Sequence, residues 1–191
     1  DGDLDIISAS TDDGRIGWFE NIDGLGTYNP SQVLIADNLQ GITDIHLADI
    51  DGDSDLDIVG SVWQQNFVFW IRNDEDSEFS DVFKIDDNVI SANSVETGDI
   101  DGDGDLDIVA AALGDVFDSQ AEDKWITWYQ NIDGMGTFSL PITVLDSTIR
   151  PVILKLEDID QDQDLDLVCS FGSGGINWFS NTDGLGGFGE A

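Results

Sequence analysis

The chain has 191 residues, of which 41 are acidic and six are Lys or Arg, so its formal net charge at neutral pH is −35. This charge excludes nucleic acid and anionic membrane surfaces as expected partners, because both are bound through clustered basic side chains. Hydrophobic residues make up 40% of the sequence, enough for a packed core, but no apolar run is long enough to span a membrane.

An aspartate-rich loop recurs about every 50 residues. It is partial in DGDLDI (1–6) and complete in DIDGDSDLDI (49–58), DIDGDGDLDI (99–108) and DIDQDQDLDL (158–167). Each copy is followed by an aromatic segment that ends in asparagine: GWFEN, FWIRN, TWYQN and NWFSN. Next comes NIDGLGTY, NIDGMGTF or NTDGLGGF, except in the second repeat, where NDEDSEF has lost the glycines. The pattern predicts one repeat region over 1–191, divided at about 1–41 (partial), 42–92, 93–149 and 150–191.

The segments between these motifs are short and rich in Ile, Val, Phe, Trp and Thr, which is typical of strands joined by tight turns. In the second repeat we expect strands at Ile42–Ile50, Leu56–Trp63, Asn66–Asn73 and Asp81–Ile85. Four antiparallel strands in a repeat of this length are typical of a β-propeller blade, and no segment has a helical period. The predicted fold is all-β, with about three and a half to four blades.

Paired aromatic residues recur in the third predicted strand of the repeats. Neighbouring side chains in a strand point to opposite faces, so Trp18–Phe19, Trp128–Tyr129 and Trp178–Phe179 should each bury one ring on either side of a sheet. The preceding strand carries small residues, and Cys169 occupies one of these positions. We interpret this only cysteine as a packing residue, and it leaves no intrachain disulfide.

The complete loops place aspartates at positions 1, 3, 5, 7 and 9, counted from Asp49, Asp99 or Asp158. So many like charges in one loop repel unless a cation lies among them. A set of oxygen ligands on a flexible loop favours Ca²⁺, since Mg²⁺ prefers a small octahedral shell and Zn²⁺ prefers His or Cys. A solvated acidic turn is the alternative. An EF-hand is excluded, because position 12 is Gly60, Ala110 or Cys169 rather than glutamate, and the flanks are predicted strands.

The loop DIDGDGDLDI, followed by WYQN and NIDGMGTF, resembles the FG-GAP/VCBS repeats of bacterial secreted and surface proteins, and the integrin alpha-subunit propeller shares the loop D-x-D-x-D-G-x-x-D. The resemblance covers essentially the whole chain. It implies a calcium-binding β-propeller, often of seven blades, whose metal loop joins the first two strands of a blade. It implies side-chain ligands at positions 1, 3, 5 and 9 and a backbone carbonyl at position 7. In this sequence those are Asp49, Asp51, Asp53 and Asp57 with Asp55; Asp99, Asp101, Asp103 and Asp107 with Asp105; and Asp158, Asp160, Asp162 and Asp166 with Asp164.

Two departures from the family pattern bear on the sites. Position 6, normally glycine, is Ser54 in one loop and Gln163 in another. A non-glycine residue in a left-handed conformation costs about 1–2 kcal/mol, so we expect the Gln163 loop to bind more weakly. The first loop retains only Asp1, Asp3 and Asp5.

Three classes of function are considered. The first is a non-catalytic, extracellular, calcium-stabilised module for adhesion or recognition. The second is a carbohydrate-binding propeller or an accessory domain of a polysaccharide-degrading enzyme, for which Trp63 and Trp125 are the candidate ligand-binding residues, with edge packing as their alternative role. The third, an enzyme, is not expected, because His46 is the only histidine and most carboxylates belong to the loops.

Two further expectations concern the third repeat and the chain ends. The segment Gly114–Asp123 lengthens the third repeat, and it is either a functional loop or a tolerated insertion. Residues 1–36 supply only the last three strands of a blade, and the C-terminal GGFGEA does not resemble the missing one. We therefore expect an open fragment of a larger propeller, whose partners are the remainder of its own chain or a self-associating copy, with a glycan or surface protein as a further candidate.

Overall fold

The computed structural model describes residues 2–74, 78–114, 126–145, 150–172 and 174–190. Throughout these residues the chain is built from strands and turns and contains no helix, so none of it could cross a membrane as one. The strands pair antiparallel in successive sheets that do not close into a barrel. The prediction of an all-β fold is confirmed.

Each of the four larger sheets is formed by one stretch of the chain, with its strands in chain order. The first has three strands, β1 (Ile6–Ser10), β2 (Arg15–Phe19) and β3 (Val33–Ala36). The second has β4 (Ile42–Ala48), β5 (Asp57–Val62), β6 (Phe67–Ile71) and β9 (Phe83–Asp86), with the small pair β7 (Asn73–Asp74) and β8 (Glu78–Phe79) beside it. The third has β10 (Ala92–Gly98), β11 (Asp107–Ala112), β12 (Ile126–Tyr129) and β13 (Ile142–Leu145). The fourth has β14 (Pro151–Glu157), β15 (Asp166–Phe171), β16 (Ile176–Asn181) and β17 (Phe188–Glu190).

The strands predicted in the second repeat are confirmed with small shifts. Strands β4, β5, β6 and β9 lie within or next to the expected ranges, and each differs from its prediction by a few residues at the ends. No end shifts by more than two residues: β4 ends at Ala48 rather than Ile50, β6 ends at Ile71 rather than Asn73, and β9 begins at Phe83 rather than Asp81. The polar Asp81 was included by the sequence pattern but makes no ladder pairing, since β6 pairs with β9 only from Phe83 onward.

The hydrophobic core lies between successive sheets, because every inner sheet has two apolar faces. In β6, Val68 and Trp70 pack toward the third sheet, while Phe67, Phe69 and Ile71 pack toward the first. In β12, Tyr129 packs toward the second sheet and Trp128 toward the fourth. The third repeat therefore buries one aromatic ring on each face, as predicted, and both rings are almost inaccessible.

The outer sheets bury their aromatic pairs less completely. Trp18 and Phe19 in β2 are both half-buried. In β16, Phe179 is buried in the core shared with the third sheet, whereas Trp178, on the opposite face, is half-buried. Cys169 is fully buried in the same core, and burial raises the pKa of its thiol to about 12, as expected for a packing residue.

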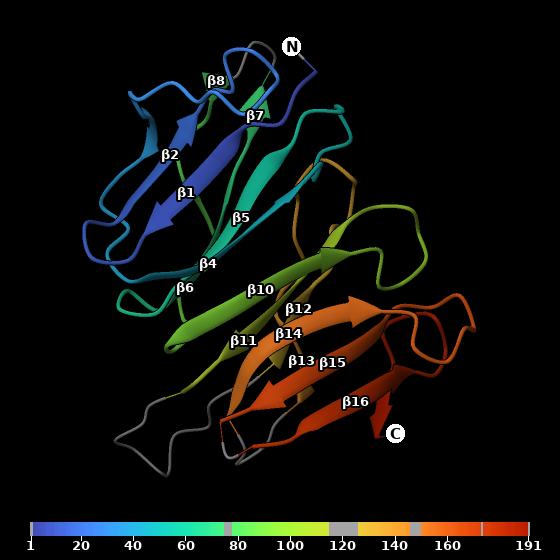
Figure 1. Cartoon of the computed structure of the whole chain (residues 1–191). Coiled ribbons are helices and arrows are strands. Elements are labelled where there is room, and N and C mark those ends of the chain that lie inside the picture. Colours follow the sequence, from blue (N-terminus) through green and yellow to red (C-terminus); the bar gives the residue numbers. More distant parts are fainter. Residues whose placement is uncertain (1, 75–77, 115–125, 146–149, 173, 191) are drawn as a thin grey trace.

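The first strands of the three complete sheets, β4, β10 and β14, lie side by side (Figure 1). Side chains connect them: the Thr43 hydroxyl donates to the Ala92 carbonyl over 2.9 Å, and the Asn93 amide donates to the Val152 carbonyl over 2.6 Å. These bonds satisfy backbone groups that face the neighbouring sheet instead of a ladder partner. The sheets are thus arranged in chain order around this row of first strands (Figure 1).

Candidate metal-binding loops

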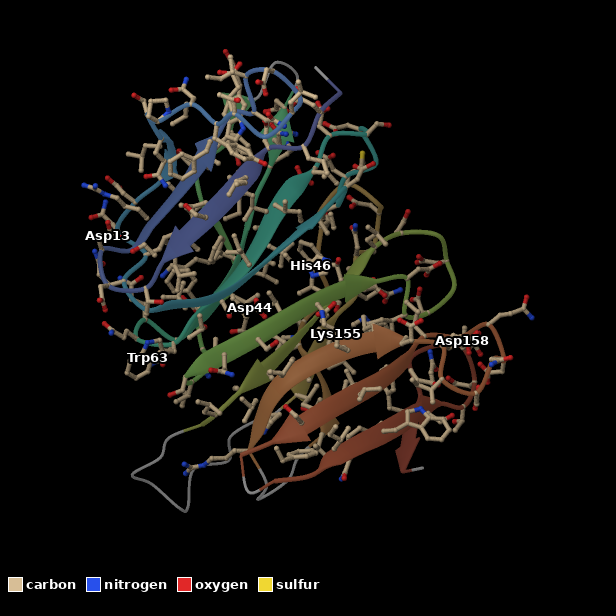
Figure 2. All side chains as sticks on the ribbon, in the orientation of Figure 1. Asp13, Asp44, His46, Trp63, Lys155 and Asp158 are labelled. Carbon is tan, nitrogen blue, oxygen red and sulfur yellow. The ribbon has the colours of Figure 1, made fainter. Side chains whose placement is uncertain are left out.

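The three complete aspartate loops all connect the first two strands of a sheet. They join β4 to β5, β10 to β11 and β14 to β15, and they lie along one edge of the molecule (Figure 1). Figure 2 places Asp158 at this edge and Trp63 at the opposite edge.

Each loop is held in one conformation by its own aspartates. The carboxylate at position 1 accepts the backbone N–H of position 6, from Ser54 to Asp49, Gly104 to Asp99 and Gln163 to Asp158, over 3.1 Å in all three loops. Position 6 is left-handed in every copy, with φ of 80° at Ser54, 99° at Gly104 and 83° at Gln163. The expectation of strain at Ser54 and Gln163 therefore has a structural basis. The fourth sheet carries a second such residue, Gln161 at position 4, with φ of 64°.

Carboxylate oxygens from alternate positions converge within each loop. Three side chains place one oxygen each within 4.8 Å of the others, at positions 1, 3 and 5 in two loops (Asp49, Asp51, Asp53 and Asp99, Asp101, Asp103) and at positions 1, 3 and 9 in the last (Asp158, Asp160, Asp166). Several of these oxygens face inward. Asp49 Oδ1, Asp51 Oδ1 and Asp99 Oδ1 are buried and accept no hydrogen bond, and the Asp51 side chain is only 9% exposed.

The aspartate at position 9 is fully buried at the base of each loop. In the third sheet, the Asp107 carboxylate accepts the backbone N–H groups of Ile100 and Asn131, over 3.2 and 2.8 Å. Asp57 and Asp166 make the equivalent pair of bonds. Burial raises the pKa of Asp107 to about 7, although the N–H donor of Asn131 opposes the shift, and burial also raises the pKa of Asp57.

In the third and fourth repeats, position 7 packs against the turn of the N-x-D-G-x-G pattern, at a residue that is glycine in both. A Cβ at Gly134 would lie 2.5 Å from Asp105 Oδ1, and one at Gly184 would lie 2.7 Å from Asp164 Oδ2. The backbone N–H of position 7 donates to the carboxylate of position 5, as from Asp55 to Asp53 over 2.9 Å and from Asp164 to Asp162 over 3.1 Å. The turn residues are glycines because no side chain fits beside these carboxylates.

The first, partial loop keeps only part of this arrangement. Asp5 accepts the backbone N–H of Asn21 over 2.7 Å, which matches the position 9 bond of the complete loops. Asp3 lies beside Gly24, and Asp1 is outside the described residues. Among the described residues, these aspartates form no group of three converging carboxylates.

Sequence reasoning missed two kinds of residue that contact the loops. The asparagine after each aromatic pair (Asn21, Asn73, Asn131, Asn181) donates its backbone N–H to the position 9 aspartate. The residue before it reaches position 3 in two repeats, where Arg72 Nε lies 3.8 Å from Asp51 Oδ2 and the Gln130 amide donates to Asp101. The asparagine was visible in the repeated motif, whereas Arg72 and Gln130 differ between repeats and gave no signal.

Away from the loops, the first strands line a pocket of about 440 Å³ with both polar and apolar side chains. His46 on β4 and Lys155 on β14 point into the space between these strands (Figure 2), and both are paired with Glu96 on β10. Trp63 is 42% exposed, and Trp125 lies outside the described residues, as does most of the Gly114–Asp123 segment.

The residues present fit a calcium ion at each complete loop. All converging donors are oxygens, several are charged and buried without a hydrogen-bond donor, and the turns are rich in left-handed residues that let alternate positions converge. A buried carboxylate oxygen without a partner is costly, and a bound cation would remove that cost.

Comparison with known proteins agrees with the loop geometry. The model of an FG-GAP-like repeat matches residues 1–60 and 58–110, which together are more than half of the chain and include the loops at Asp49 and Asp99. No curated protein matches the sequence. With the family model matched over these residues and the loop repeated at the same place in each complete sheet, the chain belongs to the FG-GAP-like repeat family.

Proposed function

We propose that this chain is a non-catalytic, calcium-binding repeat module of an extracellular or cell-surface protein, built as blades of a β-propeller and used in adhesion or recognition. One observation carries the calcium part of the proposal. Asp49, Asp51 and Asp99 each bury a carboxylate oxygen that accepts no hydrogen bond, and each of these side chains belongs to a cluster of converging aspartates.

Calcium would supply the charge that these loops lack. Positions 1, 3, 5 and 9 would hold it through carboxylates, with the carbonyl of position 7, as the family resemblance implies. The protein's own part is to preorganise the ligands: position 6 fixes position 1, and two backbone N–H groups fix position 9. Because each loop connects the first two strands of a complete sheet, a bound ion would hold the connected ends of these two strands in a fixed position.

Propeller blades are supported by the face-to-face packing of four sheets in chain order and by the row of first strands β4, β10 and β14.

An extracellular location would suit loops that bind calcium weakly, since extracellular calcium modules have dissociation constants of about 10⁻⁴–10⁻³ M. The proposed partners are calcium and further repeats, from the same chain or a second copy. A glycan ligand remains a prediction, supported only by the exposed face of Trp63.

Isothermal titration calorimetry with Ca²⁺ and with Mg²⁺ tests the proposal. We expect saturable calcium binding and weaker magnesium binding, and we expect the double variant Asp101→Asn/Asp103→Asn to lose one site. Asp13→Asn is the matched control, because Asp13 is an exposed aspartate on the β1–β2 turn, away from the loops (Figure 2). Equal heats for the double variant and the unaltered chain would contradict the assignment of this loop.

A further inference from the structure

We infer that the calcium loops at Asp49 and Asp99 are each positioned by the following repeat, so that neighbouring sites bind the ion cooperatively. The inference rests on the proposed calcium binding and concerns two linking segments, residues 131–136 and 181–186. Both begin with the asparagine that follows the aromatic pair and end with the second glycine of the N-x-D-G-x-G pattern.

The asparagine of each linking segment bonds to the loop of the preceding sheet. Asn131 Nδ2 donates to the carbonyl of Ile50 over 2.9 Å, and Asn181 Nδ2 donates to the carbonyl of Ile100 over 2.8 Å. Both acceptors are position 2 of a calcium loop, 81 residues earlier in the chain. Both asparagines are fully buried, so water does not compete for these bonds.

The same asparagine also holds its own loop. The backbone N–H of Asn131 donates to Asp107, and its Oδ1 accepts the N–H of Gly136 over 3.1 Å, which closes the linking segment on itself. Asn181 makes the equivalent bonds to Asp166 and Gly186. One rigid segment is therefore bonded to position 9 of its own loop and to position 2 of the preceding one.

The glycines of the linking segment make close contacts with both sides. A Cβ at Gly134 would clash with Asp105 of its own loop, and a Cβ at Gly52, in the preceding loop, would lie 3.7 Å from the Gly134 carbonyl. A Cβ at Gly136 would come within 2.3 Å of the Trp70 ring in the second sheet. The arrangement repeats one sheet later, where Gly186 stands against Trp128.

These contacts connect neighbouring loops. An ion that orders the loop at Asp49 fixes the Ile50 carbonyl and, through Asn131, the buried Asp107 of the next loop. Coupling between binding sites is reciprocal, so an ion at Asp99 strengthens binding at Asp49 by the same factor. Asn131 and Asn181 are positioning residues here, since their side-chain amides bond to backbone groups of the loops and linking segments.

Asn73 supplies a matched control within the chain. It occupies the same place in the second repeat, and within the described residues its side chain donates to Leu56 alone, in its own loop, over 3.2 Å. Its Oδ1 accepts no hydrogen bond from the part of the chain that the structure describes, and the sequence of this repeat lacks the glycines of the linking segment. Asn73→Ala should therefore disturb one loop, whereas Asn131→Ala should disturb two.

Site-resolved NMR titration of the full chain with Ca²⁺ tests the inference. The backbone amides of Ser54, Gly104 and Gln163 report on the three loops, since each donates to position 1. In Asn131→Ala we expect the half-saturating calcium concentration at Ser54 to rise about fivefold, in addition to a change at Gly104. In Asn73→Ala we expect a change at Ser54 alone.

The possible results separate the two claims. If the signals of the three amides in the unaltered chain do not change as calcium is added, the proposed function is wrong, and so is the inference. If they respond, but Asn131→Ala changes Gly104 and leaves Ser54 unmoved, the inference alone is overturned. Asn181→Ala repeats the test one sheet later, with Gly104 as the cross-sheet reporter, and decides the matter if Asn131→Ala does not fold.

Discussion

Asp107 has a pKa near 7 because its carboxylate is fully buried in a loop crowded with other carboxylates. This value lies above the ordinary value of 3.8, so the group contributes stability while it is protonated and loses that contribution as the pH rises through about 7. The pKa values of Asp57, Asp51 and Asp101 are raised as well, each by burial first. Without calcium we therefore expect the free energy of unfolding to increase as the pH falls from about 8 to about 5.

Urea unfolding in the presence of a chelator measures this dependence. The variant Asp107→Asn should have a flatter profile between pH 5 and 7, because it removes the titrating group. Asp23→Asn is the control, since Asp23 is exposed and hydrogen bonds with Thr27 and Leu25 lower its pKa. A chain that becomes less stable over the same fall in pH would show that burial does not govern these carboxylates.

The two glutamines in the last loop hold left-handed conformations that favour glycine. Gln163 has a φ of 83° and Gln161 a φ of 64°. Relief of this strain should make Gln163→Gly more stable by about 1 kcal/mol, a gain partly offset by the greater freedom of glycine in the unfolded chain. Thermal unfolding with and without calcium measures the change. The reverse substitution, Gly104→Gln, should destabilise the third sheet, and no difference in either variant would exclude strain as the reason for a weaker last site.

At the scale of the strands, one buried hydroxyl connects two sheets. The Tyr129 hydroxyl on β12 donates to Asp86 Oδ2 on β9 over 3.0 Å, and burial together with the Asp86 charge raises the pKa of Tyr129. Tyr129→Phe keeps the ring in the core and removes only this bond to a charged acceptor. We expect a loss of about 1–3 kcal/mol in chemical unfolding.

Tyr28→Phe provides the comparison, because Tyr28 is 37% exposed and lies between β2 and β3, in an isolated bridge with Asn21. Its stability should match that of the unaltered chain. If Tyr129→Phe proves equally harmless, the bond between β9 and β12 does not contribute to the packing of the second sheet on the third.

The strands and loops could be predicted from the sequence because their signals are local. Asp99 to Asp107 lie within nine positions, and their alternation alone indicates convergence on one point. The Trp128–Tyr129 pair predicts two buried faces, since neighbouring residues in a strand point apart. The bond from Asn131 to Ile50 could not be predicted, because it joins residues 81 positions apart and depends on how one sheet packs on the next.

Burial of position 9 was missed for a related reason. The sequence gives Asp57, Asp107 and Asp166 the same appearance as the other aspartates, and only the packed sheets show that these three are inaccessible. Contacts that vary between repeats, such as Arg72 with Asp51 and Gln130 with Asp101, also require the folded chain.

At the scale of the whole molecule, the last sheet presents apolar side chains to solvent. Ile176 is 72% exposed on β16, on the face opposite Phe179. Such a face favours association with a further repeat or a second copy. We expect sedimentation velocity in calcium to show self-association that Ile176→Ser reduces, whereas Leu140→Ser, at a leucine that is 87% exposed between β12 and β13, leaves it unchanged. A monomer at all concentrations would contradict this expectation.

Dependence of the folded state on calcium is the central claim, and thermal unfolding in excess calcium and in excess EDTA tests it most directly. A ligand at a hundred times its dissociation constant adds about 2.7 kcal/mol for each site, and binding also relieves repulsion among the clustered aspartates. We predict that chelation lowers the melting temperature by many degrees and that Asp107→Asn reduces the difference. Identical melting curves in calcium and in EDTA would contradict the account.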